Sequence, residues 1–211
     1  MEIKIVKPKI KKDRLIEGTI NNSINDKVEG INFKNQSVNF KINSVEWNEC
    51  LFENVDFSSI EFQDCDFIDC IFINCNLSNM SINQKSIIRC QFIDCKMIGC
   101  QLFSSNLLNI LFKNCILDYS NLTTSNLKNT QFEECNMVNS RLFELNLINV
   151  TFDNCSFKES EIYKTSLKDI DFSSCDIDAI FIDTVSVTGI IITADQVICL
   201  ATLLGIQIKK Y

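Results

Sequence analysis

Cysteine is the residue with the greatest capacity for chemistry in this sequence, which contains twelve cysteines and no histidine. Eleven of the cysteines are separated from one another by five residues or a multiple of five: Cys50, Cys65, Cys70, Cys75, Cys90, Cys95, Cys100, Cys115, Cys135, Cys155 and Cys175. A structural zinc site needs ligand pairs with about two to four intervening residues, together with a suitable partner pair. Because this spacing provides none, and because buried free cysteine behaves as a small hydrophobic side chain, we interpret these residues as core thiols. We expect no metal and no cofactor.

The elements that position the cysteines follow from a repeat. A Phe-x-x-Cys phrase recurs every twenty residues from Phe72 to Cys175, and every fifth residue from Trp47 to Val187 is large and apolar. On an α-helix, positions five apart drift around the cylinder, and in a straight strand they alternate between the two faces. The period of five therefore fits neither regular element.

The residue two positions before each large one resolves the period. It is mostly small or apolar, as at Cys50, Val55 and Ser120, with Lys85 as an exception. Two such residues point the same way in an extended segment, so both face inward and the remaining residues must include a corner. Four sides then complete one turn of twenty residues. The sequence predicts a square, all-β parallel solenoid of about seven coils, stacked at about 4.8 Å, with one side lined by phenylalanine.

Individual units make the repeat recognisable. The sequences Cys-Asn-Leu-Ser-Asn from Cys75, Ser-Asn-Leu-Thr-Thr from Ser120 and Ser-Asn-Leu-Lys-Asn from Ser125 resemble the pentapeptide-repeat family, whose consensus is close to A-(D/N)-L-x-x. The resemblance covers residues 45–192. It implies that the solenoid is a right-handed quadrilateral β-helix.

The limits of the repeat divide the chain into three segments. Residues 1–44 form a basic N-terminal arm and an irregular first coil or cap, residues 45–192 form the β-helix, and residues 193–211 form a C-terminal helix and a short strand. The arm is either a solvated segment, which we favour, or an electrostatic handle. In the tail, Thr193 and Gln196 have the spacing of a capping box, and Ile206–Ile208 is the expected strand.

Charge and outward apolar residues mark two candidate surfaces. The net charge is −7, and four carboxylates fall on or beside the phenylalanine side: Glu133, Glu134, Asp153 and Asp171. Such a surface repels nucleic acid and membranes and attracts basic partners. Seven apolar residues are expected to crowd two adjoining sides and form an interface: Ile68, Ile71, Ile73, Ile88, Ile93, Leu108 and Leu111.

Enzyme activity is not expected. The sequence has no nucleophile elbow and no phosphate-binding glycine loop. Its paired carboxylates, such as Glu133 with Glu134, would lie on a convex surface with no cleft to raise a pKa. The N-terminus lacks the apolar core of a signal peptide and no apolar run is long enough to span a membrane, so we expect a cytoplasmic protein.

The tail also resembles that of the quinolone-resistance (Qnr-type) pentapeptide proteins. Those proteins pair two rods end to end, which implies a homodimer here through Val197, Leu200 and Leu204. They bind type II DNA topoisomerases, DNA gyrase and topoisomerase IV, by imitating duplex DNA. Members that protect gyrase carry loops between coils, and this chain has none between residues 45 and 192. Two functions stay open: a DNA-mimicking topoisomerase binder, and an interaction scaffold with an unrelated partner.

Overall fold

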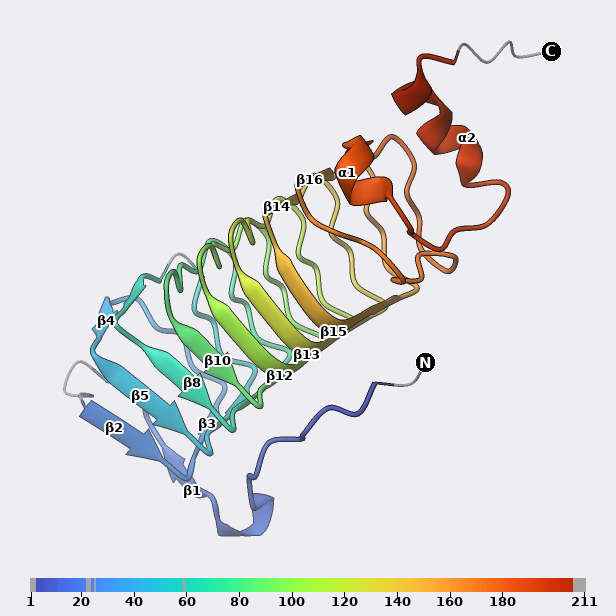
Figure 1. Ribbon diagram of the computed structural model, residues 1–211. Coiled ribbons are helices and arrows are strands. Elements are labelled where there is room, and N and C mark those ends of the chain that lie inside the picture. Colours follow the sequence, from blue (N-terminus) through green and yellow to red (C-terminus); the bar gives the residue numbers. More distant parts are fainter. Residues whose placement is uncertain (1–2, 22–23, 25, 59, 207–211) are drawn as a thin grey trace.

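The chain forms an elongated rod, seen in a computed structural model that describes residues 3–21, 24, 26–58 and 60–206 (Figure 1). The rod is a right-handed quadrilateral β-helix of about eight turns. All strand pairings among the described residues are parallel. This confirms the fold class that the period of five predicts.

The largest sheet has twelve strands and covers two adjoining sides of the rod. The Phe side, centred on Phe52 and its equivalents, contains β1 (Ile16–Gly18), β3 (Ile31–Lys34), β6 (Leu51–Glu53), β9 (Ile71–Ile73) and β11 (Gln91–Ile93). The Trp side, centred on Trp47 and its equivalents, contains β2 (Asp26–Glu29), β5 (Val45–Asn48), β8 (Asp66–Ile68) and β10 (Ser86–Ile88). Three longer strands continue from the Trp side to the Phe side: β12 (Asn106–Lys113), β13 (Asn126–Glu133) and β15 (Asn146–Asp153).

The other two sides are less regular. One of them, centred on Phe62 and its equivalents, contains a three-stranded sheet of β14 (Arg141–Phe143), β16 (Glu161–Tyr163) and β17 (Phe181–Ile182), and a pair made by β4 (Ile42–Asn43) and β7 (Phe62–Gln63). On the other, centred on Phe57 and its equivalents, the described coils are joined by isolated bridges, such as Asp56 to Asn76. In the described part of the chain, four short helical segments lie at the ends: η1 (Lys12–Arg14), α1 (Thr184–Val187), α2 (Val197–Leu200) and η2 (Ala201–Leu204).

Corners are made by residues in the left-handed conformation. The residue two positions after each large apolar centre has a positive φ almost throughout, for example 54° at Asn54, 57° at Asn109 and 53° at Asn149. Asparagine and aspartate tolerate this region better than most residues because their side chains form local hydrogen bonds. The repeat therefore encodes its own turn, which explains the frequent asparagine at this position.

Strict register stacks like residues on one another. On the Phe side, the ring centroids of Phe92 and Phe112 are 5.0 Å apart and those of Phe112 and Phe132 are 4.8 Å apart, with nearly parallel planes. These separations lie within the favourable range for offset aromatic stacking. The rings are fully buried and form the axis of the core.

Most of the inward cysteines form hydrogen bonds between coils. The Cys70 Sγ lies 3.4 Å from the Trp47 carbonyl oxygen, and the Cys115 Sγ lies 3.3 Å from that of Phe92. The Ser105 hydroxyl donates the equivalent bond to Ile82 at 2.8 Å. All twelve cysteines are free thiols, and only Cys199 is not fully buried. Burial raises the pKa of the Cys100 thiol to about 12, which keeps it protonated.

The β-helix begins before the regular repeat. Phe33 lies opposite Phe52, nineteen residues later, and Gly18 lies opposite Phe33, fifteen residues later. Residues 16–43 therefore contribute coils that are shorter than twenty residues. Pairing survives because the omitted residues lie outside the aligned strands.

The C-terminal tail is fastened to the last coil by Gln196. Thr193 and Gln196 form the reciprocal bonds of a capping box, at 2.8 and 3.3 Å. The Gln196 Nε2 also donates to the carbonyl oxygens of Phe172 and Cys175. The helix that follows consists of two four-residue segments, α2 and η2. The expected strand at Ile206–Ile208 reaches beyond the described residues. None of the helices in the described part of the chain has the length and apolar character needed to span a membrane.

Candidate protein-binding surfaces

The predicted acidic residues occupy one part of the Phe side. Glu133, the last residue of β13, lies in register with Lys113 and Asp153 on the neighbouring strands. Glu134 takes the adjacent corner with a φ of 54°. Asp171 lies one coil further along, one residue before the centre Phe172, and pairs with Ile191. We call Glu133, Glu134, Asp153 and Asp171 the acidic patch.

A lysine limits the extent of this patch. The Lys113 Nζ lies 3.0 Å from the Glu133 Oε2, so Glu133 is the member whose charge is partly compensated. Glu134, Asp153 and Asp171 are exposed. Hydrogen bonds from the Ser173 hydroxyl and amide lower the pKa of Asp171. The acidic patch therefore covers the C-terminal half of the Phe side and ends at Lys113.

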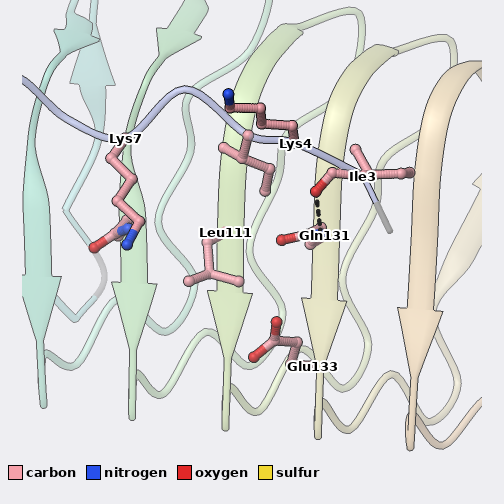
Figure 2. A pocket seen from close by; sticks show the side chains of 8 residues that line it. Ile3, Lys4, Lys7, Leu111, Gln131 and Glu133 are labelled. Atoms are coloured by element: carbon pink, nitrogen blue, oxygen red, sulfur yellow. Dashed lines mark hydrogen bonds between the residues drawn. The ribbon is translucent and has the colours of Figure 1, made fainter. Parts of the chain in front are cut away.

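The basic N-terminal arm is docked along the rod (Figure 1). The Lys9 amide donates to the Asp69 Oδ1 at 2.9 Å, and the Val6 amide donates to the Asn109 Oδ1 at 3.3 Å. The Gln131 Nε2 donates to the Ile3 carbonyl at 3.0 Å (Figure 2). The interpretation of the arm as a solvated segment is therefore wrong. Sequence reasoning missed these contacts because they join residues 60 to 128 positions apart and because the arm contributes mainly its backbone.

The arm docks onto the corner between the Trp side and the Phe side. We call Asp69, Arg89, Asn109, Asn129 and Asn149 the polar corner. The Asn129 Nδ2 donates to the Asn109 Oδ1 at 3.2 Å, and the Asn149 Nδ2 donates to the Asn129 Oδ1 at 3.1 Å. A carbonyl oxygen has two lone pairs, so Asn109 can accept from Val6 and Asn129 together.

Asp69 is the most deeply buried charge of the polar corner, with 4% of its surface exposed. The Arg89 guanidinium binds it with two hydrogen bonds, of 2.7 Å from Nε and 2.6 Å from Nη2. Burial opposes ionisation of Asp69, but the hydrogen bonds from Arg89 and from the Lys9 amide outweigh it, so its pKa lies below the usual value. Asp69 is therefore an ionised anchor for the arm.

The apolar surface expected on the two adjoining sides flanks this corner. Ile71 faces outward yet is only 6% exposed. A cavity of about 670 Å³ separates the arm from the sheet and is lined by Ile3, Lys4, Ile5, Lys7, Gln91, Leu111, Gln131 and Glu133 (Figure 2). The chain's own arm thus lies over part of the expected interface.

The predicted tail interface is only partly exposed. Val197 is 53% exposed, whereas Leu200 is half-buried and packs against the core. Leu204 lies in η2, and its side chain falls outside what the structure describes. Phe181, Val185 and Ile198 add further exposed apolar surface at this end of the rod.

Metal-ligating groups do not converge in the part of the chain that the structure describes, where no three Cys, Asp or Glu side chains form a set that could hold an ion. The carboxylates of Asp176 and Asp178 are exposed on the convex surface, and Asp178 faces Lys158 at 3.4 Å. The outside of the rod carries side chains in regular rows. These features define a solenoid repeat protein whose outer surfaces are available for contacts.

The particular repeat is shown by comparison with known families. A model of the pentapeptide repeat region matches residues 65–142 and again 105–182. The chain belongs to the pentapeptide repeat family. A comparison with curated protein sequences finds no match.

The solved structures that match this chain include the following three proteins. Full-length QnrB1, a plasmid-mediated fluoroquinolone resistance protein, is 17% identical, with 85% of this chain and 100% of that chain covered and a TM-score of 0.37. HetL, involved in heterocyst differentiation regulation in the cyanobacterium Nostoc sp. strain PCC 7120, is 12% identical, with coverages of 80% and 86% and a TM-score of 0.42. Rfr23 from the cyanobacterium Cyanothece 51142 is 14% identical, with coverages of 80% and 88% and a TM-score of 0.18.

Proposed function

We propose that this protein is a non-enzymatic protein-binding rod whose acidic patch receives the basic, DNA-binding surface of DNA gyrase or topoisomerase IV. The observation that carries the proposal is the clustering of exposed carboxylates on one side of a regular rod with a net charge of −7. A row of negative charge on a rod attracts a surface shaped and charged to hold duplex DNA.

A scaffold for a different protein partner is the second candidate. Lys113 interrupts the row of carboxylates, and the polar corner shows that this rod already holds a polypeptide segment, its own arm. Extended repeat surfaces commonly bind proteins along their length. The two candidates differ in whether the partner must have a DNA-binding surface.

Replacing Glu133, Glu134, Asp153 and Asp171 together with lysine separates the candidates. We expect the wild-type protein to inhibit gyrase supercoiling and the four-lysine variant to lose that inhibition, because the patch would then repel the basic surface. The melting temperature should change little, since exposed charges contribute little to stability. The measurement is a supercoiling assay with increasing protein.

A matched control changes four exposed carboxylates elsewhere on the rod to lysine: Glu46, Glu61, Glu159 and Asp178. This variant has the same net charge as the first and should still inhibit. Equal loss in both variants would mean that total charge matters and the patch does not. Absence of inhibition by the wild-type protein would contradict the topoisomerase proposal and leave the scaffold.

We also propose a tail-to-tail homodimer through Val197, Leu200 and Leu204. Exposed Val197 supports it, because an apolar side chain at a solenoid end lowers the free energy when a second copy covers it. Val197→Asp should convert the dimer to a monomer in sedimentation experiments, whereas Ile148→Asp, a change at an exposed position in β15 on the side of the rod, should leave it intact. A monomeric wild-type protein at micromolar concentration would contradict the dimer.

A further inference from the structure

The docked arm shows what kind of segment the polar corner can hold. Ile3, Ile5 and Ile10 are half-buried, whereas Lys4 and Lys9 are exposed. The hydrogen bonds that hold the arm use its backbone: the amides of Val6 and Lys9 donate and the carbonyl of Ile3 accepts. The corner therefore selects an extended chain with isoleucines facing it and leaves the side chains of Val6 and the intervening lysines in solvent.

The spacing of the arm contacts matches the spacing of the coils. Val6 and Lys9 are three residues apart, which is about 10 Å in an extended chain. Their acceptors, Asn109 and Asp69, are two coils apart, which is about 9.6 Å at the spacing of paired strands. Two amides three residues apart in an extended segment can thus reach acceptors that lie two coils apart on the corner.

The groove continues beyond the end of the docked arm. The arm also leaves a cavity between itself and the sheet. A cavity of about 480 Å³ follows on the other side of Ile3, where Asn149, Asp169 and Asp171 are among its lining residues. The exposure of the corner residues increases towards this second cavity: Asp69 and Asn109 are buried, Asn129 is half-buried and Asn149 is exposed. A longer segment would continue over Asn149.

We propose that the polar corner is a binding groove for an extended segment of a partner protein, one in which aliphatic residues alternate with lysines, and that residues 3–10 fill this groove in the free chain. Four carboxylates lie along the groove: Asp69, Glu133, Asp169 and Asp171. Arg89 and Lys113 pair with the first two, and Lys168 lines the second cavity, so one net negative charge remains and favours a positively charged occupant. The partner segment can bind only after the arm leaves the groove. The arm competes with it for the groove at a millimolar effective concentration, which is typical of a short tether. The groove shares Glu133 and Asp171 with the acidic patch, but its occupant is an extended peptide and its test does not involve a topoisomerase.

The test uses the full-length chain with the arm released by Val6→Pro and Lys9→Pro. Proline has no amide hydrogen, so both hydrogen bonds to the corner are lost while the extended backbone is preserved. The probe is a fluorescent synthetic peptide with the sequence of residues 3–12. We expect this peptide to bind the double proline variant at least ten times more tightly than it binds the wild-type protein. The matched control, Val6→Ala with Lys9→Ala, retains both amides and should behave as the wild-type protein.

Peptide variants identify the chemistry that the groove recognises. Serine in place of the three isoleucines should abolish binding, and glutamine in place of the lysines should weaken it and reduce its salt dependence. On the wild-type protein, saturating unlabelled peptide should speed amide hydrogen exchange at Val6 and Lys9, a readout that requires no mutation. Equal peptide affinity for all three proteins, or unchanged exchange, would overturn the proposal. Sedimentation showing that copies exchange arms would make the occupant a second copy and would likewise overturn it.

Discussion

Phe112→Ala is expected to lower the free energy of unfolding by about 3–5 kcal/mol, as other buried aromatic truncations do. The ring is fully buried and is stacked on both sides, 5.0 Å from Phe92 and 4.8 Å from Phe132. The coils above and below are held in register by parallel strand pairs, so they cannot close the cavity. Urea unfolding monitored by circular dichroism measures the change.

Cys135→Ala is the matched control for this prediction. It removes one small buried atom and a weak hydrogen bond of 3.5 Å to the Phe112 carbonyl oxygen. We expect a far smaller loss than for Phe112→Ala, because little apolar surface and little volume are removed. If the cysteine change proved the more damaging of the two, the assignment of the core to the stacked rings would be wrong.

Arg89→Ala is expected to lower stability by about 1–3 kcal/mol, the usual penalty for leaving a buried polar group without its partner. Asp69, with 4% exposure, would keep only the Lys9 amide. Undocking of the arm would let water reach the carboxylate, and this limits the loss. Lys113→Ala breaks an ion pair that is much more exposed and should cost less than about 1 kcal/mol.

The effect of Arg89→Ala should also depend on pH. The folded-state pKa of Asp69 is lower than its unfolded value, so its ionised form contributes stability that is fully present above the unfolded pKa. That contribution is lost as the pH falls through the lowered folded pKa. The stability difference between the wild-type protein and the variant should therefore shrink in acid. Urea unfolding at neutral pH and near pH 3 measures it, and a difference that grew in acid would contradict the assigned role of Asp69.

The fold could be predicted because one local pattern repeats without interruption. Each large centre and the small residue two positions before it define the inward face of one side. Equivalent residues of the next coil lie in register with them. The corner residue carries its own signal, since Asn54 and Asn109 adopt the left-handed region that asparagine tolerates. The short helix α1 was missed, although Asp183 caps it by accepting a hydrogen bond from the Ser186 amide at 2.6 Å. The period of five continues to Val187 and conceals that change.

The candidate surfaces were less predictable from the sequence. Register places Glu133 beside Asp153, as a period of twenty requires, but the pairing of Glu133 with Lys113 depends on side-chain rotamers. The docking of the arm depends on contacts between residues that no local pattern connects, such as Lys9 with Asp69. A run of lysines gives no indication that its backbone will be the part that binds.

Coils shorter than twenty residues at the N-terminal end bear on how this chain can change in evolution. Phe33 pairs with Phe52 across a nineteen-residue turn and Gly18 pairs with Phe33 across fifteen, so a corner or a whole side can be lost without disrupting the neighbouring strands. Duplication of the gene segment that encodes one coil would lengthen the rod and leave every stack of equivalent residues intact. The arm, however, contacts alternate coils at Asp69 and Asn109. A single coil inserted between these contacts would put the arm out of step by about 4.8 Å, so selection to keep the arm docked would fix the number of coils there.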